Sequence, residues 1–418
     1  MFIHLNKGVF ICLKTVIYTQ NTTTSVHILS YKKTTLNVQY FNSIAEISND
    51  IWRELNCSDN LYFSPEYLEA LQLNNPAIKF AYIILFNSTN KAIALATIQI
   101  IDFNLDSIQN NIESVVDWVK CVGRKLGFLS STKILKILTC GNVFVSGEHG
   151  IFIKNNQNKT EIIKQIAKAV VDFSNINSEN MVDVFILKDF ENESLSISSV
   201  LVKEGYNSFN VEPNMVLKLD SNWESLNDYL GVLKTKFRVK AKKALKLSAQ
   251  LQVEEVTGSR LIELFPEMTL LYKMVSNKAT FNLGDFNLQT YQMLKHNLGD
   301  AYFLKAYWLE DKLVGFLSGI INNSSLDAHF VGIDYDNNKQ YAIYQRMLYD
   351  YICLGINKKV QMINFGRTAS EIKSSVGAVP QDLTIYLRHK KTITNGILSL
   401  FLKRIQPQYF IQKNPFKN

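Results

Sequence analysis

The sequence predicts an α/β protein in which one unit of mixed β-sheet and helices occurs twice. Two observations lead to this prediction: two similar β-hairpins, at 78–100 and 301–321, and the same order of elements after each of them. Each hairpin has an Ala-Tyr start, a polar turn and an apolar return strand, which is typical of paired antiparallel strands. Since the later strands alternate with helices, crossover connections and some parallel pairing are expected as well.

The elements after the two hairpins match one by one. The first copy continues with strands at 147–154, 182–188 and 215–219, a helix at 161–173 and a helix ending at Gly205. The second copy continues with strands at 326–334, 360–365 and 383–388, a helix at 341–355 and a helix ending at Gly377. The order β-β-β-α-β-α-β therefore occurs twice.

Length and composition fit this arrangement. A chain of 418 residues, 47% of them hydrophobic, can bury two cores. We expect a weakly ordered leader at 1–35, an N-terminal domain at 36–219, and a C-terminal domain at 220–418 that includes a basic helix at 232–248.

Charge and cysteine usage narrow the functional classes. The formal net charge of +8 favours anionic partners. Five scattered cysteines without a C-x-x-C pair indicate neither a disulfide framework nor a zinc site, and the six histidines show no metal-ligand spacing. A reducing, cytoplasmic compartment is the expectation. No apolar run is long enough to predict a spanning helix.

The basic helix is the first candidate site. Seven Lys or Arg residues fall within 234–246, and Leu230, Leu233 and Phe237 begin an apolar stripe at helical spacing. Four cations recur at four-residue intervals, and they are Lys234, Arg238, Lys242 and Lys246. One interpretation is a solvated helix face. The other is an anion track for cofactor phosphates, tRNA or anionic lipid headgroups.

The strand at 326–334 holds the candidate base. Alternation places Asp327 and His329 on one face and Phe330 and Asp334 on the other. The ordinary pKa of histidine lies near neutrality, so His329 is the candidate that takes a proton from an attacking amine. A histidine packed in the core is the alternative.

The segment 360–378 predicts a strand–helix corner that binds an anion. Gly366 ends the strand, Thr368 and Glu371 form a capping-box pattern, and Gly377 stands where a glycine ends many helices. Where a strand ends at the N-terminus of a helix, the first backbone N–H groups of the helix are free to bind an anion. Arg367 and Lys373 add positive charge there. A purely structural corner is the alternative. The equivalent first copy, Ile186 to Ser194, carries acids instead, so the C-terminal copy is expected to hold the ligand.

Two basic and apolar segments are weaker candidates. They are 115–138 and the part of the chain after Asp382, which includes 396–402. Such segments can lie on an anionic membrane, but ordinary amphipathic helices have the same composition.

The corner and the repeated unit together resemble one known group. The "FGRT…EIKs…GA" pattern at 365–378 is similar to GNAT-fold acyltransferases of the FemAB-like and CelD-like group, which include bacterial peptidoglycan-bridge transferases. The resemblance extends over about 36–418 and is strongest from Gly332 to Ala378. It implies two tandem GNAT-like domains, each with a mixed, mostly antiparallel sheet flanked by helices.

The resemblance also implies an activity. It suggests an N-acyltransferase that moves an acyl group from acyl-CoA, with acetyl-CoA as the first candidate, to a primary amine. Cell-envelope or polysaccharide metabolism is the expected setting. In GNAT enzymes the loop after the 326–334 strand binds the cofactor pyrophosphate, which here gives Asn338, Lys339, Gln340 and Tyr341, together with Arg367 and Lys373. Tyr344 is the candidate acid toward the leaving group.

This chain departs from the GNAT pattern at that loop. No glycine lies between Gly332 and Gly355, and Asp334 and Asp336 stand where a pyrophosphate would lie. Aminoacyl-tRNA therefore stays open as the donor, and so does a non-catalytic module that binds an anionic envelope precursor. Peripheral contact with the inner membrane is a further expectation, and no metal is expected.

Overall fold

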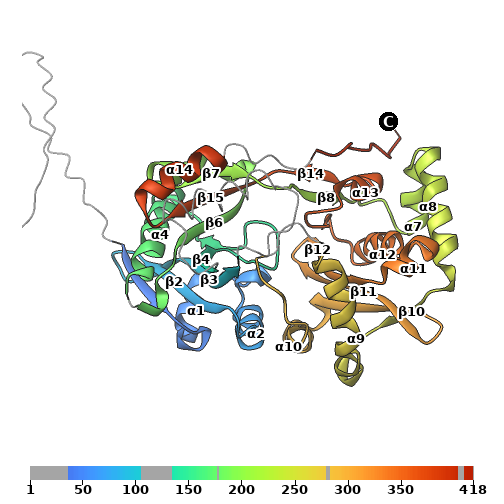
Figure 1. Ribbon diagram of the computed structural model, residues 1–418, viewed down its shortest axis with the longest axis horizontal. Helices are drawn as coiled ribbons and strands as arrows, with labels where there is room; N and C mark the ends of the chain where they lie inside the picture. The colour runs from blue at the N-terminus through green and yellow to red at the C-terminus, as the bar shows by residue number, and fades with distance from the viewer. Residues whose placement is uncertain (1–35, 105–133, 177, 279–282, 403–408, 418) are drawn as a thin grey trace, which may run out of the picture. The chain divides into compact units, whose positions relative to one another are not determined.

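The computed structural model describes residues 36–104, 134–176, 178–278, 283–402 and 409–417. They form two mixed sheets flanked by helices, which confirms the predicted fold class (Figure 1). The first sheet has the order β1-β2-β3-β4-β6-β15-β7, with β5 beside β3, and the second has the order β14-β8-β13-β12-β11-β10-β9.

The strands of the first sheet are β1 (Asn37–Phe41), β2 (Lys79–Phe86), β3 (Ala92–Asn104), β4 (Ile134–Cys140), β5 (Ile151–Ile153), β6 (Val184–Glu191), β7 (Asn207–Asn210) and β15 (Leu383–His389). Those of the second sheet are β8 (Asn214–Lys218), β9 (Gln252–Glu255), β10 (Tyr302–Leu309), β11 (Lys312–Asn322), β12 (Ser325–Ile333), β13 (Met362–Asn364) and β14 (Val379–Gln381). The two predicted hairpins are β2–β3 and β10–β11, both antiparallel. β4–β6 and β12–β13 are parallel.

Two strands lie in the sheet opposite to the one expected from the repeat. β8 was assigned to the N-terminal copy but pairs with β13 and β14. β15 was assigned to the C-terminal copy but pairs with β6 and β7. Both are short apolar strands, so alternation alone does not reveal the sheet that each one joins. The predicted division at residue 219 therefore does not separate the two sheets, and as a domain boundary it stays a prediction.

Strand β4 is not predicted by the sequence pattern, because Lys136 and the basic residues before it hide a short buried strand. The strand expected at 147–154 is limited to β5. Most of the segment 115–138 and the whole leader at 1–35 lie outside the described residues.

The predicted helices lie at the expected places in the chain, but their first and last residues differ from prediction. The expected helices at 161–173 and 341–355 are α4 (Lys159–Ser174) and α12 (Ile343–Asn357), and the basic helix is α8 (Thr235–Leu247). Two short helices, α5 (Leu195–Ser198) and α6 (Val200–Lys203), replace the one expected to end at Gly205. The remaining helices are α1 (Asn49–Leu55), α2 (Pro65–Asn74), α7 (Leu226–Val232), α9 (Gly258–Ser276), α10 (Thr290–Leu298), α11 (Tyr335–Tyr341), α13 (Ser370–Ser375) and α14 (Thr392–Leu402). None of the helices that the structure describes is long and apolar enough to cross a membrane.

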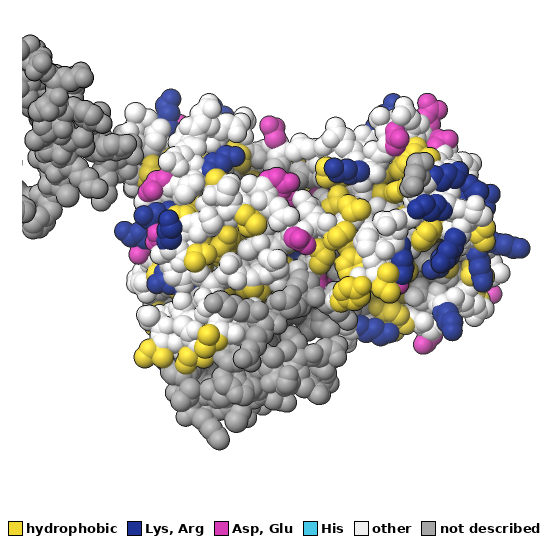
Figure 2. Space-filling model, turned by 90° about the horizontal axis from the view of Figure 1, so that it is seen from above, with side chains coloured by type: hydrophobic (Ala, Val, Ile, Leu, Met, Phe, Trp, Pro, Cys, Tyr) yellow, Lys and Arg dark blue, Asp and Glu magenta, His cyan; other side chains and the backbone are white. Residues whose placement is uncertain are grey.

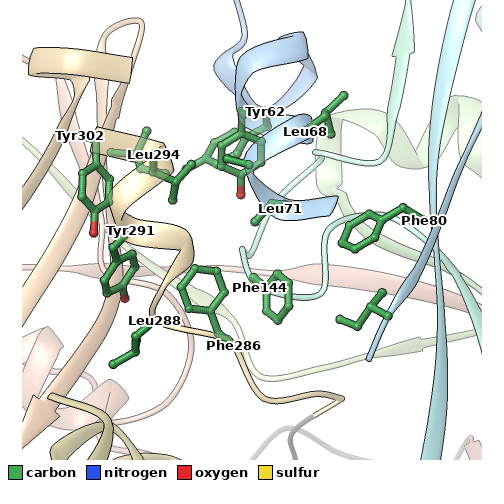
Figure 3. Packing of buried hydrophobic residues seen from close by; sticks show 14 of the residues in the cluster. Tyr62, Leu68, Leu71, Phe80, Phe144, Phe286, Leu288, Tyr291, Leu294 and Tyr302 are labelled. Carbon is green, nitrogen blue, oxygen red and sulfur yellow. The ribbon is translucent and has the colours of Figure 1, made fainter. Parts of the chain in front are cut away.

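One apolar cluster joins the two halves. It packs Tyr62, Leu71 and Phe144 of the first half against Phe286 and Tyr291 of the second (Figure 3). Helix α2 lies against α10 there. Burial of large apolar side chains is the main stabilising term of a fold, so this shared core fixes how the polar groups of the two sheets meet.

Candidate functional site

A bulge in β6 places two charged residues inside the protein. Leu187 pairs with Tyr386 and Phe190 with Thr384, so Lys188 and Asp189 together face the single residue Ile385. Such a bulge re-aims side chains, and bulges often lie beside functional sites. Both side chains are buried, and Lys188 Nζ lies 2.6 Å from Asp189 Oδ2.

The predicted residue Arg367 reaches this pair from the other half. Its guanidinium donates to Asp189 Oδ1, and the backbone N–H of Gly147 donates to Oδ2 at 3.2 Å. Although burial opposes ionisation, the charges of Lys188 and Arg367 hold the pKa of Asp189 below its usual range. Among the described residues, the buried Nε of Arg367 has no hydrogen-bond partner. The three residues form an ion cluster across the seam between the sheets.

The strand–helix corner that carries Arg367 differs in part from prediction. The expected capping box is wrong, because Thr368 and Ala369 both have positive φ and Ala369 caps α13 without a side-chain bond. The expected end at Gly377 is confirmed: φ is +101°, and the N–H groups of Gly377 and Ala378 donate to the carbonyls of Ser374 and Lys373.

Lys373 lies inside the corner rather than on its surface. Its Nζ donates to the carbonyl oxygens of Gly366 at 3.1 Å and Arg367 at 2.6 Å. Burial lowers the pKa of Lys373 to about 7. These contacts stabilise the corner, and the predicted role in holding a ligand anion stays a prediction.

His329 lies in a second bulge. Ala328 pairs with Gly319 and Val331 with Leu317, so His329 and Phe330 both oppose Ser318. The predicted alternation therefore fails here, and both rings contact Phe286 in the shared core. Burial lowers the pKa of His329 to about 3, and its Nε2 has no partner among the described residues. An imidazole with this pKa is a weak base at neutral pH.

Asp327 is a buried carboxylate that faces the other half. It accepts hydrogen bonds from Tyr62 Oη at 2.6 Å and from the side chain of Asn364. Burial raises its pKa. The ring of His149 lies 4.0 Å from that of Tyr62, and its buried Nδ1 has no partner in the described part of the chain. Polar groups of both halves thus line the seam.

The expected cofactor loop is not a loop. Residues 335–341 form α11, and Ala342 with φ +50° separates it from α12. Lys339 and Gln340 are exposed, Gln340 Nε2 donates to Tyr341 Oη at 3.1 Å, and Asn338 Oδ1 accepts the backbone N–H of Tyr344 at 2.9 Å. Burial raises the pKa of Tyr344 well above its ordinary value.

The start of α11 already carries an anion. The Asp334 carboxylate accepts the backbone N–H of Asp336 at 3.0 Å and pairs with Lys312 Nζ at 2.7 Å. The Asp334 carboxylate therefore already occupies the backbone N–H group that a cofactor phosphate would need. These residues fit a pyrophosphate poorly.

The predicted anion track on α8 is a solvent-exposed surface. Lys234, Lys242 and Lys246 are exposed and Arg238 is half-buried, and none of the four forms an ion pair within the described residues. Lys234 Nζ donates to the carbonyl of Asn414 at 3.1 Å. Dark blue side chains gather over this helix in Figure 2. Helix α8 also contacts α11, which holds four of the expected cofactor residues, whereas Arg367, expected with them, lies in the ion cluster.

Three residues of the seam were missed by sequence reasoning, namely Tyr62, Lys188 and Asp189. A signal existed for Asp189 alone. The acids of the first copy stand at the repeat position of the Gly-Arg-Thr corner, and opposite charges at equivalent positions of two copies indicate a pair. No local pattern marks Tyr62, whose partner Asp327 is 265 residues away.

Comparison with known proteins shows likeness of fold only. No protein-family model and no curated protein sequence matches the chain. FemX covers 84% of this chain and 99% of its own, at 10% identity and a TM-score of 0.50. A tandem GNAT protein from the clavulanic acid biosynthesis pathway covers 84% and 98%, at 8% identity and a TM-score of 0.50. The chain therefore has the tandem GNAT fold that FemX shares, as its sequence pattern predicted.

Proposed function

We propose that the chain is an N-acyltransferase that moves an aminoacyl group from tRNA to a primary amine. The observation that supports this proposal best is the exposed basic face of α8. It presents several unpaired cations along one helix, as a surface that follows a phosphate backbone does. The tandem GNAT fold, which the chain shares with FemX and with a tandem GNAT protein, agrees with a transferase.

Acyl-CoA is the alternative donor, but the residues at the start of α11 fit its pyrophosphate poorly. A pyrophosphate at the start of α11 would meet the Asp334 carboxylate, already paired with Lys312. The pyrophosphate and the carboxylate are both negative and would repel each other. Moving Asp334 away would break its ion pair with Lys312. We therefore assign no step to coenzyme A.

The reaction joins the amine nitrogen to the carbonyl carbon and breaks the ester bond of the carrier. The proton lost by the amine ends on the leaving ribose oxygen, so charges and atoms balance. Burial moves the pKa values of His329 and Tyr344 away from neutrality. The proposal therefore relies on positioning of the two substrates, and the roles of His329 as base and Tyr344 as acid stay predictions.

Where the protein acts is part of the proposal. An acceptor amine on a cell-envelope precursor, in the cytoplasm or at the inner face of a membrane, agrees with the basic surface, because anionic lipid attracts lysines.

The test is binding and transfer with aminoacyl-tRNA at several salt concentrations. We expect affinity to fall steeply between about 50 and 200 mM salt. Lys242→Ala, Lys243→Ala and Lys246→Ala together should weaken binding and reduce the slope of log K against log salt by roughly one per lost phosphate contact. The matched control replaces three exposed lysines of the first half, Lys91→Ala, Lys168→Ala and Lys203→Ala.

Three outcomes decide the matter. An unchanged slope in the α8 variant, or an equal loss in the control, would contradict the α8 assignment. Binding without transfer to any amine would favour the non-catalytic module. Tight binding of acyl-CoA that does not depend on salt would favour acyl-CoA as the donor in place of aminoacyl-tRNA.

A further inference from the structure

The first sheet splits at the end of β4 and encloses a pocket. Parallel pairing of β4 with β6 ends at Cys140 and Leu187, while β5 pairs with β3. A pocket of about 250 Å³ lies between β5 and the last residues of β6, with α4 beside it. The pocket lies within the N-terminal copy, whereas the sequence predicts the ligand in the C-terminal copy.

The walls of the pocket are mixed, with slightly more polar than apolar surface. Aromatic rings and aliphatic chains form the apolar part, chiefly Phe63, Ile151, Phe152, Ile163, Phe190 and Ile197. Ligand sites combine apolar surface with a few placed polar groups that fix orientation. Lys188 lines the pocket too, but its Nζ already contacts Asp189 and the carbonyls of Asn142 and Val145.

Glu148 is the lining carboxylate that forms no ion pair within the described residues, although the charge of Lys159 acts on it. Its Oε1 accepts the backbone N–H of Glu191 at 2.7 Å and its Oε2 accepts the hydroxyl of Ser194 at 2.9 Å. Both donors are neutral, and no Lys, Arg or His of the described chain forms an ion pair with it. A carboxylate oxygen can accept more than one hydrogen bond, so both remain able to bind a donor.

A second carboxylate adds to this negative charge. Glu191 accepts from Gln381 Nε2 at 2.8 Å, and like Glu148 it is half-buried without an ion-pair partner in the described chain. Partial burial of an uncompensated charge is costly. Asp189, two residues earlier, is compensated by Lys188 and Arg367. Lys159 also lines the pocket, but it is exposed, where water screens its charge.

We propose that this pocket binds a primary amine with an apolar body. The ammonium group donates to Glu148, and the body lies against Phe63, Phe152 and Phe190. A cation there compensates the carboxylate, and the walls remove the body from water. That the amine is the acceptor of the transfer rests on the proposed function; the binding itself does not.

The position suits an acceptor site. Lys188 and Phe190 of the pocket wall flank Asp189, which pairs with Arg367 of the second half. An occupied pocket is thus one residue from the seam that joins the two sheets.

Calorimetry on the full chain at pH 8 tests the binding, with n-hexylammonium as the probe and 1-hexanol as its uncharged match. We expect hexylammonium to bind at least tenfold more tightly than hexanol. Glu148→Gln should lower the affinity for hexylammonium tenfold or more. Glu193→Gln, which removes the same charge from an exposed acid outside the pocket lining, should change it less than twofold.

A second variant covers the case in which Glu148→Gln fails to fold. Ile197→Phe fills the pocket without changing charge and should weaken hexylammonium at least fivefold. Equal binding of amine and alcohol, no binding, or full affinity in Ile197→Phe would overturn the proposal. If the chain binds the amine through Glu148 but transfers no acyl group, only the proposed function is contradicted. If Glu148→Gln leaves the transfer rate unchanged, only the acceptor role of the pocket is contradicted.

Discussion

The bulged end of β6 and the turn that follows β13, here called the first and second corners, occupy equivalent places in the repeat and carry opposite charges. The first has the acids Asp189 and Glu191, and the second has Arg367. In the structure Arg367 donates to Asp189, so the difference between the copies is what joins them. A repeat that kept the same charge at both places would have put like charges together at the seam.

The two corners also bury their charge differently. Asp189 is fully buried on a bulge, whereas the Arg367 side chain is 24% exposed. The acid therefore depends on its partners more than the arginine does, because a buried charge without a counter-ion is strongly destabilising. Variants that change one corner at a time should reveal this asymmetry.

The largest expected effect is that of Asp189→Asn. It leaves Lys188 buried without its counter-ion and Arg367 unpaired, so the free energy of unfolding should fall by about 3–5 kcal/mol. Urea denaturation at pH 7 measures it. Asp50→Asn, which breaks the exposed pair with Arg53, should cost no more than about 0.5 kcal/mol. If Asp189→Asn also costs so little, the ion cluster does not hold the seam.

The next effect contrasts Gly141, beside Lys188, with Gly366 of the second corner. A Cβ on Gly141 would lie 2.3 Å from Lys188 Cγ, whereas one on Gly366 would have nothing within 4 Å. Gly141→Ala should therefore cost about 2–3 kcal/mol by overpacking, in addition to the backbone strain at its φ of +148°. Gly366→Ala, at φ +73°, should cost only the backbone strain of about 1 kcal/mol. The same denaturation series compares them, and equal costs would mean that the stem of Lys188 moves freely.

The parts of the fold that the sequence predicts correctly are those whose contacting residues lie close together along the chain. The hairpins β2–β3 and β10–β11 were predicted because turn and strand pattern lie within about twenty residues. The exchange of β8 and β15 was not, since both strands are compatible with either sheet. The failed capping box shows the same limit on a smaller scale: Ala369 adopts positive φ, which a propensity pattern assigns to glycine or asparagine.

The candidate site was predicted in the same uneven way. Arg367 was singled out from its own corner, and the exposed cations of α8 from their spacing. Its partner Asp189 lies 178 residues away, and only the fold brings the two together. The bulges at Lys188–Asp189 and at His329–Phe330 each change the face on which side chains lie, and neither bulge has a local sequence signal.

The smallest expected effect concerns Glu191, at the first corner. Burial, followed by the charges of Glu148, Glu193 and Asp189, raises the pKa of Glu191 to about 7, from an ordinary value of 4.5. The folded chain then binds more protons than the unfolded chain between these values, so this residue lowers stability as pH rises from about 4.5 to 7. Glu191→Gln keeps an acceptor for Gln381 and removes the charge. Because Glu191 is partly exposed, the variant should be more stable than the parent by no more than about 1 kcal/mol at pH 8 and equal to it at pH 4. Urea midpoints at the two pH values measure the difference, and a gap that is constant with pH would show that the charge of Glu191 is already compensated.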